Sequence, residues 1–180
     1  MPRKALFLDR DGVINVDHAY VHRSDQFEFC PGIFELVAQA RAADYTVVVV
    51  TNQAGIGRGY YSEDDFHRLT NWMLSEFENR GAAIDRVYFC PDHPEHGLGV
   101  YKRDTPMRKP GSGMLLQAAL ELDIDLTASL LVGDHESDIT AGRGAGLRLT
   151  ILLDKDGTKR EGTRADVVVD SLAAILPHLI

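Results

Sequence analysis

The chain has 180 residues, of which 44% are hydrophobic and 26% charged, and its formal net charge is −8. This length fits one domain with a substantial buried core, and the acidic balance argues against non-specific nucleic-acid binding, which needs a basic surface. The sequence holds no run of 18 apolar residues that would cross a membrane, and two cysteines make no disulfide framework. The apolar stretch near the start is too short for a signal peptide. We therefore expect a cytoplasmic protein without a membrane partner.

The first predicted element is a short buried strand over 5–8, which delivers Asp9, Asp11 and Gly12 into a turn. Two carboxylates this close repel one another unless a cation or a proton lies between them. An Asp-rich turn that only caps the next segment is the alternative at this point, because Asp and Gly are common turn residues.

Predicted helices and strands alternate through the rest of the chain. Pro31 suits the first turn of a helix, and Ser62 with Asp65 resembles a capping box that starts another. Helices are predicted over 31–40, 62–80, 114–122, 137–145 and 172–179, and strands over 46–51, 86–89, 129–134, 147–153 and 166–169.

The predicted strands are apolar on both faces, which is typical of a parallel sheet covered by helices. We therefore predict a three-layer, Rossmann-like α/β fold over 1–180 as a single domain. In such sheets ligands bind beyond the carboxyl ends of the strands, so the functional residues are expected there.

Polar side chains gather where the predicted strands end, together with one lysine in the loop after the third strand. An all-oxygen set of carboxylates suits a hard cation, and few protein ligands favour Mg²⁺ over Ca²⁺. The residues concerned are Asp9, Asp11, Thr51, Asn52, Lys109, Asp134 and Asp138.

These residues match, in order, four motifs of the haloacid dehalogenase superfamily of aspartate-nucleophile phosphatases, which the chain resembles over nearly its whole length. The motifs are Asp9-x-Asp11-Gly12, Thr51, Lys109 and Gly133-Asp134-x-x-x-Asp138. The resemblance implies the haloacid-dehalogenase-like fold. The segments after the first and third strands are too short for a large cap domain.

The resemblance implies a Mg²⁺-dependent phosphatase in which Asp9 attacks phosphorus and forms an aspartyl-phosphate. Asp11 would protonate the departing alkoxide and then activate water, while Thr51 and Lys109 would hold the phosphoryl oxygens. The implied metal ligands are Asp9, the main-chain carbonyl of Asp11, and Asp134, with Asp138 bracing the metal site from behind.

Within the superfamily, the chain resembles the phosphatases that remove the C7 phosphate of D-glycero-D-manno-heptose 1,7-bisphosphate in nucleotide-activated heptose (lipopolysaccharide core) biosynthesis. The related histidinol-phosphate phosphatases of histidine biosynthesis share much of the pattern and remain the alternative. The matching segments are 9–15, 17–22, 49–59 and 108–110.

This closer resemblance implies two substrate loops, at about 12–30 and 91–108. Arg108 would bind the distal C1 phosphate with its forked guanidinium, although a solvated loop arginine is the alternative. His135 stands where these families usually have a lysine. The implied substrate contacts are Asp17, His18, Ala19, Tyr20, Thr51, Asn52, Gln53, Ala54, Arg108, Lys109 and His135.

The chain departs from the family at its zinc loop, where Cys-x-His and Cys-x-Cys are usual. Here the positions read Cys90-x-Asp92 and Thr105-x-Met107. A structural zinc normally takes four Cys or His ligands, so we expect no bound zinc. His93 and His96 could join Cys90 as ligands of some metal, but their spacing is poor.

A non-catalytic phosphosugar-binding module is the alternative from another class of function. The Asp9–Asp11 pair weighs against it, because a binding protein has no need of two adjacent carboxylates. The expected partner is a small phosphosugar substrate, and the protein is expected to act as a monomer. The sequence leaves open which anomer of the heptose bisphosphate is used.

Overall fold

A six-stranded parallel sheet forms the centre of the computed structural model, which describes residues 2–180. The strand order is β3-β2-β1-β4-β5-β6, and the direction of progression reverses between β1 and β4. The parallel sheet confirms the predicted fold class. The strands are β1 (Ala5–Leu8), β2 (Thr46–Asn52), β3 (Arg86–Cys90), β4 (Leu130–Gly133), β5 (Leu149–Leu153) and β6 (Val167–Val169).

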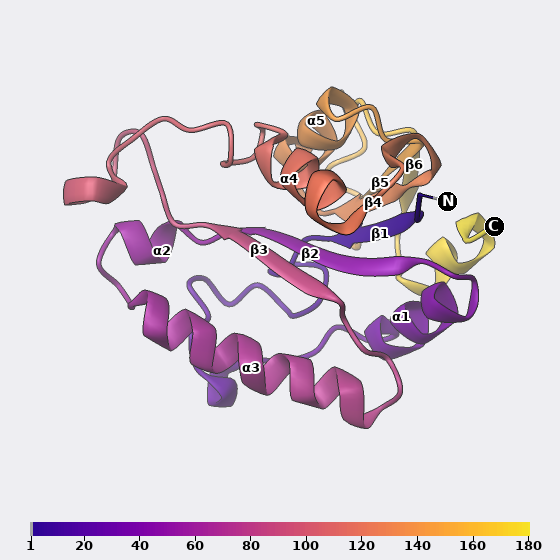
Figure 1. The fold of residues 1–180 in the computed structure, drawn as a ribbon, viewed down its shortest axis with the longest axis horizontal. Helices are drawn as coiled ribbons and strands as arrows, with labels where there is room; N and C mark the ends of the chain where they lie inside the picture. Colours follow the sequence, from indigo (N-terminus) through magenta and orange to yellow (C-terminus); the bar gives the residue numbers. More distant parts are fainter. Residues whose placement is uncertain (1) are drawn as a thin grey trace.

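Helices cover both faces of the sheet (Figure 1). The helices α1 (Ile33–Ala42) and α3 (Glu63–Asn79) lie on one face, and α4 (Gly113–Leu122) and α5 (Glu136–Gly144) lie on the other. The alternation along β1 divides the core accordingly, since Leu6 and Leu8 belong to one apolar cluster, and Ala5 and Phe7 to the other. The remaining helices are α2 (Ala54–Gly57) and the 3₁₀ segments η1 (Ser24–Gln26), η2 (Gly99–Tyr101), η3 (Leu126–Ala128) and η4 (Ala173–His178).

The two segments where a capping domain could be inserted hold only loops and single short turns. Residues 9–32 contain η1, and residues 91–112 contain η2. Over the described residues, no helix combines the length and the apolar character that a bilayer crossing requires.

Two helix starts and the closing segment of the chain test the predictions made from the sequence. The capping box of α3 is confirmed, because the Ser62 hydroxyl accepts from the Asp65 backbone N–H at 3.1 Å and Asp65 returns the contact. The predicted start at Pro31 is wrong, since Gly32 is the N-cap of α1. The predicted closing helix over 172–179 is the shorter 3₁₀ segment η4, which contains Pro177, a residue without the N–H that an α-helix needs.

Asp166 ties β5 and α5 together just before β6 begins. Its carboxylate accepts from the backbone N–H and hydroxyl of Thr150 at 2.8 and 2.7 Å and from Arg143 at 2.9 Å. Burial alone raises the pKa of Asp166, but these donors outweigh it and hold the pKa below its usual value. The folded state therefore binds the proton more weakly than the unfolded state, and this carboxylate stabilises the fold above its unfolded pKa.

We predict that Asp166→Ala lowers the free energy of unfolding by about 1 kcal/mol at pH 7, because hydrogen bonds to a charged but partly exposed group are lost. The difference from wild type should shrink as the pH falls through the folded pKa. Urea unfolding at pH 7 and at about pH 3 measures both values, with Asp170→Ala, at an exposed carboxylate nearby, as control. An equal loss at the two pH values would contradict this account.

Candidate active site

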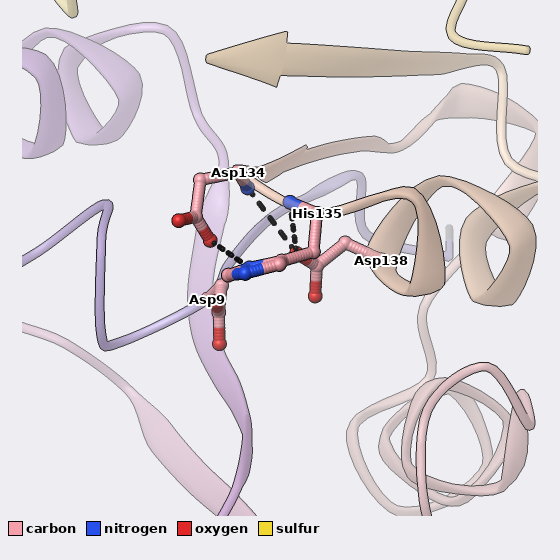
Figure 2. A group of neighbouring side chains, drawn as sticks. All are labelled: Asp9, Asp134, His135 and Asp138. Atoms are coloured by element: carbon pink, nitrogen blue, oxygen red, sulfur yellow. Dashed lines mark hydrogen bonds and ion pairs between the residues drawn. The ribbon is translucent and has the colours of Figure 1, made fainter. Parts of the chain in front are cut away.

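The acidic residues converge where the strand order reverses. Asp9 follows β1 directly and Asp134 follows the adjacent strand β4, and the Asp9 backbone N–H donates to the Val132 carbonyl at 3.0 Å. Figure 2 shows the side chains of Asp9, Asp134, His135 and Asp138 gathered together, and one ligand atom of each lies within 4.8 Å of the others. This is the place where open α/β sheets bind ligands.

Two glycines allow the carboxylates to approach the backbone. Gly12 has φ +92°, and a Cβ atom there would lie 2.1 Å from an oxygen of Asp134. A Cβ at Gly133 would lie 2.2 Å from the Cβ of Asp138. Only a residue without a side chain fits at these positions, so the glycines of the sequence motifs are required by the proximity of the carboxylates.

A buried ammonium group joins the acidic residues. Lys109, from the loop before α4, donates to Asp9 Oδ1 at 2.8 Å and to the Val50 carbonyl at 2.8 Å, and lies 2.6 Å from Asp138 Oδ1. Burial opposes its charge, yet the carboxylates of Asp138 and Asp9 hold the pKa of Lys109 above its usual value. Lys109 is therefore charged at neutral pH.

The carboxylates of Asp9 and Asp134 differ in their proton affinity. Burial and the charge of Asp138 raise the pKa of Asp9 well above its usual value, and Lys109 offsets this only in part. Burial also raises the pKa of Asp134, but His135 and then Lys159 outweigh it, so the pKa of Asp134 is lowered. Asp9, Asp134 and Asp138 face two ammonium groups, Lys109 and Lys159, so three carboxylates outnumber two cations. The excess of hard, negatively charged oxygen atoms fits a divalent cation such as Mg²⁺.

Asp138 has both carboxylate oxygens engaged within the protein. Oδ1 faces Lys109, and Oδ2 accepts from the backbone N–H groups of Asp134 and His135 at 3.2 and 3.1 Å. Its side chain is 2% exposed. This arrangement favours a bracing position for Asp138 over direct metal ligation.

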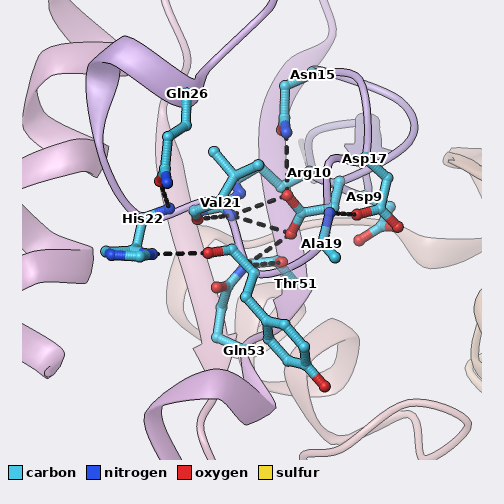
Figure 3. A network of polar contacts seen from close by, with 12 residues as sticks. Asp9, Arg10, Asn15, Asp17, Ala19, Val21, His22, Gln26, Thr51 and Gln53 are labelled. Atoms are coloured by element: carbon cyan, nitrogen blue, oxygen red, sulfur yellow. Dashed lines mark hydrogen bonds and ion pairs between the residues drawn. The ribbon is translucent and has the colours of Figure 1, made fainter. Parts of the chain in front are cut away.

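Asp11 is not part of this cluster, and its carboxylate is held by the side chains of Arg10, Asn15 and Gln53, which are labelled in Figure 3. Arg10 donates to both oxygens at 2.9 and 3.1 Å, Asn15 donates to Oδ1 at 3.0 Å, and Gln53 donates to Oδ2 at 3.0 Å. The carboxylate orientation is therefore fixed, while about a quarter of the side chain stays exposed.

A cavity of about 450 Å³ opens beside these residues. The loop 12–30 contributes Asp17, Ala19 and Tyr20, and the loop 91–108 contributes Arg108. The structure therefore brings most of the predicted contact residues to one cavity. From the predicted set, its lining contains Asp9, Asp11, Asp17, Ala19, Tyr20, Asn52, Gln53, Ala54, Arg108, Lys109, His135 and Asp138.

Two predicted substrate contacts lie off this cavity within the described part of the chain. His18 binds Glu28 at 2.8 Å and lines a separate hollow with residues of the η1 turn. Thr51 is fully buried, and its hydroxyl accepts from Gln53 at 2.9 Å. A residue's place in a sequence motif therefore did not indicate whether its side chain faces the cavity or holds a neighbouring side chain.

Several residues of this region were not predicted from the sequence. Tyr61, Gly55 and Ser137 line the cavity, and Lys159 donates to the Asp134 carbonyl at 2.6 Å. Lys159 lies in the loop after β5, and nothing in its spacing indicates that it reaches Asp134. It brings a lysine to the site although His135 occupies the position where the families usually have one.

Arg108 is attached to a buried carboxyl-bearing residue in its own loop. Its guanidinium donates to the Asp92 carbonyl at 3.3 Å, and Asp92 Oδ2 accepts from Arg103 at 2.9 Å. The Asp92 side chain is 4% exposed, and the Cys90 thiol lies 3.9 Å from the same oxygen. Asp92 therefore anchors the loop 91–108 near the end of β3.

A family model described as HAD-hydrolase-like matches residues 106–175. A D-glycero-α-D-manno-heptose-1,7-bisphosphate 7-phosphatase of Burkholderia mallei is 55% identical, and the alignment covers 99% of this chain and 95% of that one. A D-glycero-β-D-manno-heptose-1,7-bisphosphate 7-phosphatase of Pasteurella multocida is 48% identical, with 99% and 97% coverage.

Among solved structures, the chain is similar to D,D-heptose 1,7-bisphosphate phosphatase from B. bronchiseptica in complex with magnesium and phosphate. The TM-score is 0.81, the sequence identity is 32%, and 98% of this chain and 97% of that chain are covered. Fold, cavity and sequence agree, and the chain belongs to the D-glycero-D-manno-heptose-1,7-bisphosphate 7-phosphatase family of HAD-like hydrolases.

Proposed function

We propose that the protein is a Mg²⁺-dependent phosphatase that hydrolyses the C7 phosphate of D-glycero-D-manno-heptose 1,7-bisphosphate through an aspartyl-phosphate intermediate. The observation that carries the activity is the buried Lys109 between Asp9 and Asp138, beside Asp134 and at the wall of the cavity. The substrate rests on the relatives, which are named for this reaction at 55% and 48% identity.

In this mechanism Asp9 attacks phosphorus and displaces the sugar alkoxide. Lys109 binds Asp9 Oδ1, so we assign the attack to Oδ2. The ammonium also offsets the charge of the phosphoryl oxygens in the transition state. Thr51 is better placed to hold Gln53 than to touch the phosphoryl group, because its hydroxyl is buried and accepts from Gln53.

Asp11 would protonate the departing alkoxide and then remove a proton from the water that hydrolyses the aspartyl-phosphate. General acid–base catalysis of this kind contributes about 10²–10⁴-fold to the rate. The cavity gives Asp11 access to the leaving group, while Arg10 and Asn15 fix the carboxylate from the protein side.

Asp9, the main-chain carbonyl of Asp11, and Asp134 would hold the Mg²⁺. When bound, the ion supplies charge neutralisation between the Asp9 carboxylate and the anionic phosphate. Asp138 would brace this site through Lys109 and the backbone of the segment 134–135.

Arg108 would bind the distal C1 phosphate, because it lines the cavity and a guanidinium can contact two phosphate oxygens at once. The loops 12–30 and 91–108 would supply the sugar contacts. Histidinol phosphate carries no second phosphate, so it would offer Arg108 no phosphate group to bind. The relatives include phosphatases named for the α and for the β anomer, so both anomers belong in the test.

We predict that purified protein with Mg²⁺ releases phosphate from heptose 1,7-bisphosphate with a kcat/KM at least about 100-fold above that for histidinol phosphate. Such a ratio corresponds to about 2.7 kcal/mol of transition-state discrimination, which a bidentate arginine–phosphate contact can supply. Arg108→Ala should remove most of the preference. A wild-type preference for histidinol phosphate would refute the substrate and the role of Arg108 together.

We predict that Asp9→Asn abolishes phosphate release and that Asp11→Asn lowers kcat by about 10²–10⁴-fold. Both variants keep the size and shape of the side chain, so thermal melting should show a folded protein. Glu95→Gln, in the loop 91–108 but on an exposed side chain, is the matched control. Activity near wild type in either aspartate variant would remove the assigned mechanism and favour a binding role.

We also propose that the protein binds no zinc and that Asp92 and Arg103 hold the loop 91–108 in its place. Thr105 and Met107 are poor zinc ligands, and Asp92 is already paired with Arg103 at 2.9 Å. We predict less than 0.1 zinc per chain, on the order of a trace contaminant, by elemental analysis of protein purified without chelators. Stoichiometric zinc would overturn this proposal.

Finally, we propose that the protein acts in the cytoplasm as a monomer. The thiols of Cys30 and Cys90 are free and buried, which fits a reducing compartment. The residues that the mechanism uses at the cavity, Asp9, Asp11 and Lys109, all come from one chain, so the mechanism calls on no residue of a second copy. Fractionation of expressing cells and light scattering of the purified protein test the two points.

A further inference from the structure

The side-chain amide of Gln53 is engaged on both of its ends. Its nitrogen donates to Asp11 Oδ2 at 3.0 Å and to Thr51 Oγ1 at 2.9 Å, so both N–H bonds are used. Its oxygen accepts from the hydroxyl of Tyr61. Gln53 is 2% exposed, so its amide has no room to exchange these partners for water.

Gln53 differs from the other donors to Asp11 in its position. All three donors are almost fully buried, but Gln53 lines the cavity, whereas Arg10 and Asn15 do not. Gln53 donates to Oδ2, which also accepts from Arg10 at 3.1 Å, while Oδ1 accepts from Arg10 and Asn15. Gln53 is therefore the donor that holds Oδ2 from the side of the cavity, where a leaving group would be bound.

Tyr61 determines which way the Gln53 amide faces. Its hydroxyl donates a proton, so the amide oxygen must point to Tyr61 and the amide nitrogen must point to Asp11. Burial raises the pKa of Tyr61, which keeps the hydroxyl protonated and able to donate.

The Tyr61 ring is itself held on two sides. The ring is 7% exposed and stacks on His22 of the loop 12–30, with ring centroids 4.9 Å apart and planes 4° apart. A Cβ atom at Gly55 would lie 2.2 Å from the ring, so a larger residue there would displace it. The neighbouring Tyr60 is 55% exposed and has no such contact with Gln53 among the described residues.

We propose that Tyr61 is a positioning residue of the catalytic acid, acting through Gln53 to hold Asp11 Oδ2 toward the leaving group. The inference rests on the proposed function, because it assigns a role in phosphate-ester cleavage. In this role the side-chain amide of Gln53 binds Asp11 and Thr51 and makes no direct contact with the substrate.

The position of Oδ2 matters only when the leaving group needs a proton. A sugar alkoxide is a poor leaving group, so P–O cleavage requires proton transfer from Asp11 to the bridging oxygen as that bond breaks. A p-nitrophenolate leaves as a stable anion and needs no proton. A variant that misplaces Asp11 should therefore slow cleavage of the sugar phosphate much more than cleavage of p-nitrophenyl phosphate.

The test compares kcat/KM for heptose 1,7-bisphosphate and for p-nitrophenyl phosphate in Tyr61→Phe and in Gln53→Met. For each substrate, kcat/KM reports the steps up to departure of the leaving group and excludes the later hydrolysis of the aspartyl-phosphate. We expect each variant to lose about tenfold or more on the sugar phosphate, within the ~10²–10⁴-fold of a general acid, and less than about threefold on p-nitrophenyl phosphate.

Tyr88→Phe is the matched control. Tyr88 also donates its partly buried hydroxyl to a side chain, Glu121 at 2.6 Å, but it lies on β3 and is not among the residues that line the cavity. Tyr88→Phe should leave kcat/KM unchanged for both substrates. Gln53→Met keeps the inference testable if Tyr61→Phe does not fold.

Equal losses on the two substrates, or no loss on the sugar phosphate, would overturn the positioning role while leaving the proposed function intact. Wild-type protein that cleaves neither ester would refute the proposed function and the inference with it.

Discussion

The structure of the site depends on one buried cation. Lys109 neutralises the carboxylates of Asp9, just after β1, and Asp138, in α5, which would otherwise repel one another at the carboxyl ends of the strands. Burying a charged group is expensive unless it is paired and hydrogen-bonded, and Lys109 has three oxygen partners. The ion pair with Lys109 lets the fold bury the Asp9 carboxylate. It also keeps a positive charge beside Asp9, so that an anionic substrate can approach it.

Around this cation, the chain separates the two acidic tasks by their surroundings. Asp9 lies among acidic neighbours, next to the place that suits a divalent ion. Asp11 is only two residues further along, yet its side chain turns into a set of N–H donors from Arg10, Asn15 and Gln53. Between the two aspartates the strand gives way to a turn, since the backbone N–H groups of Val13 and Ile14 donate to the Arg10 carbonyl.

The buried strands, the alternation of helices and the clustering of polar residues at strand ends could be predicted, because each depends on local patterns of apolar and turn residues. Contacts across long loops could not. Tyr60 and Tyr61 are adjacent and chemically identical, and tertiary contacts of Tyr61 with Gly55, His22 and Gln53 decide which ring turns inward. The reach of Lys159 to Asp134 and the pairing of Asp92 with Arg103 depend on loop conformations that no periodicity encodes. The closing segment was predicted as an α-helix because its apolar spacing allows one, but the structure has the 3₁₀ segment η4.

The two ends of the described chain meet on the side of the sheet away from the cavity. Lys4, at the start of β1, donates to the carbonyl of Ile180 at 2.7 Å, and both ends lie together in Figure 1, opposite the carboxyl ends of the strands. A fusion partner or a surface attached to either end would therefore face away from the opening through which a substrate enters. The molecule can be tethered, labelled or joined to another protein there without obstructing that opening.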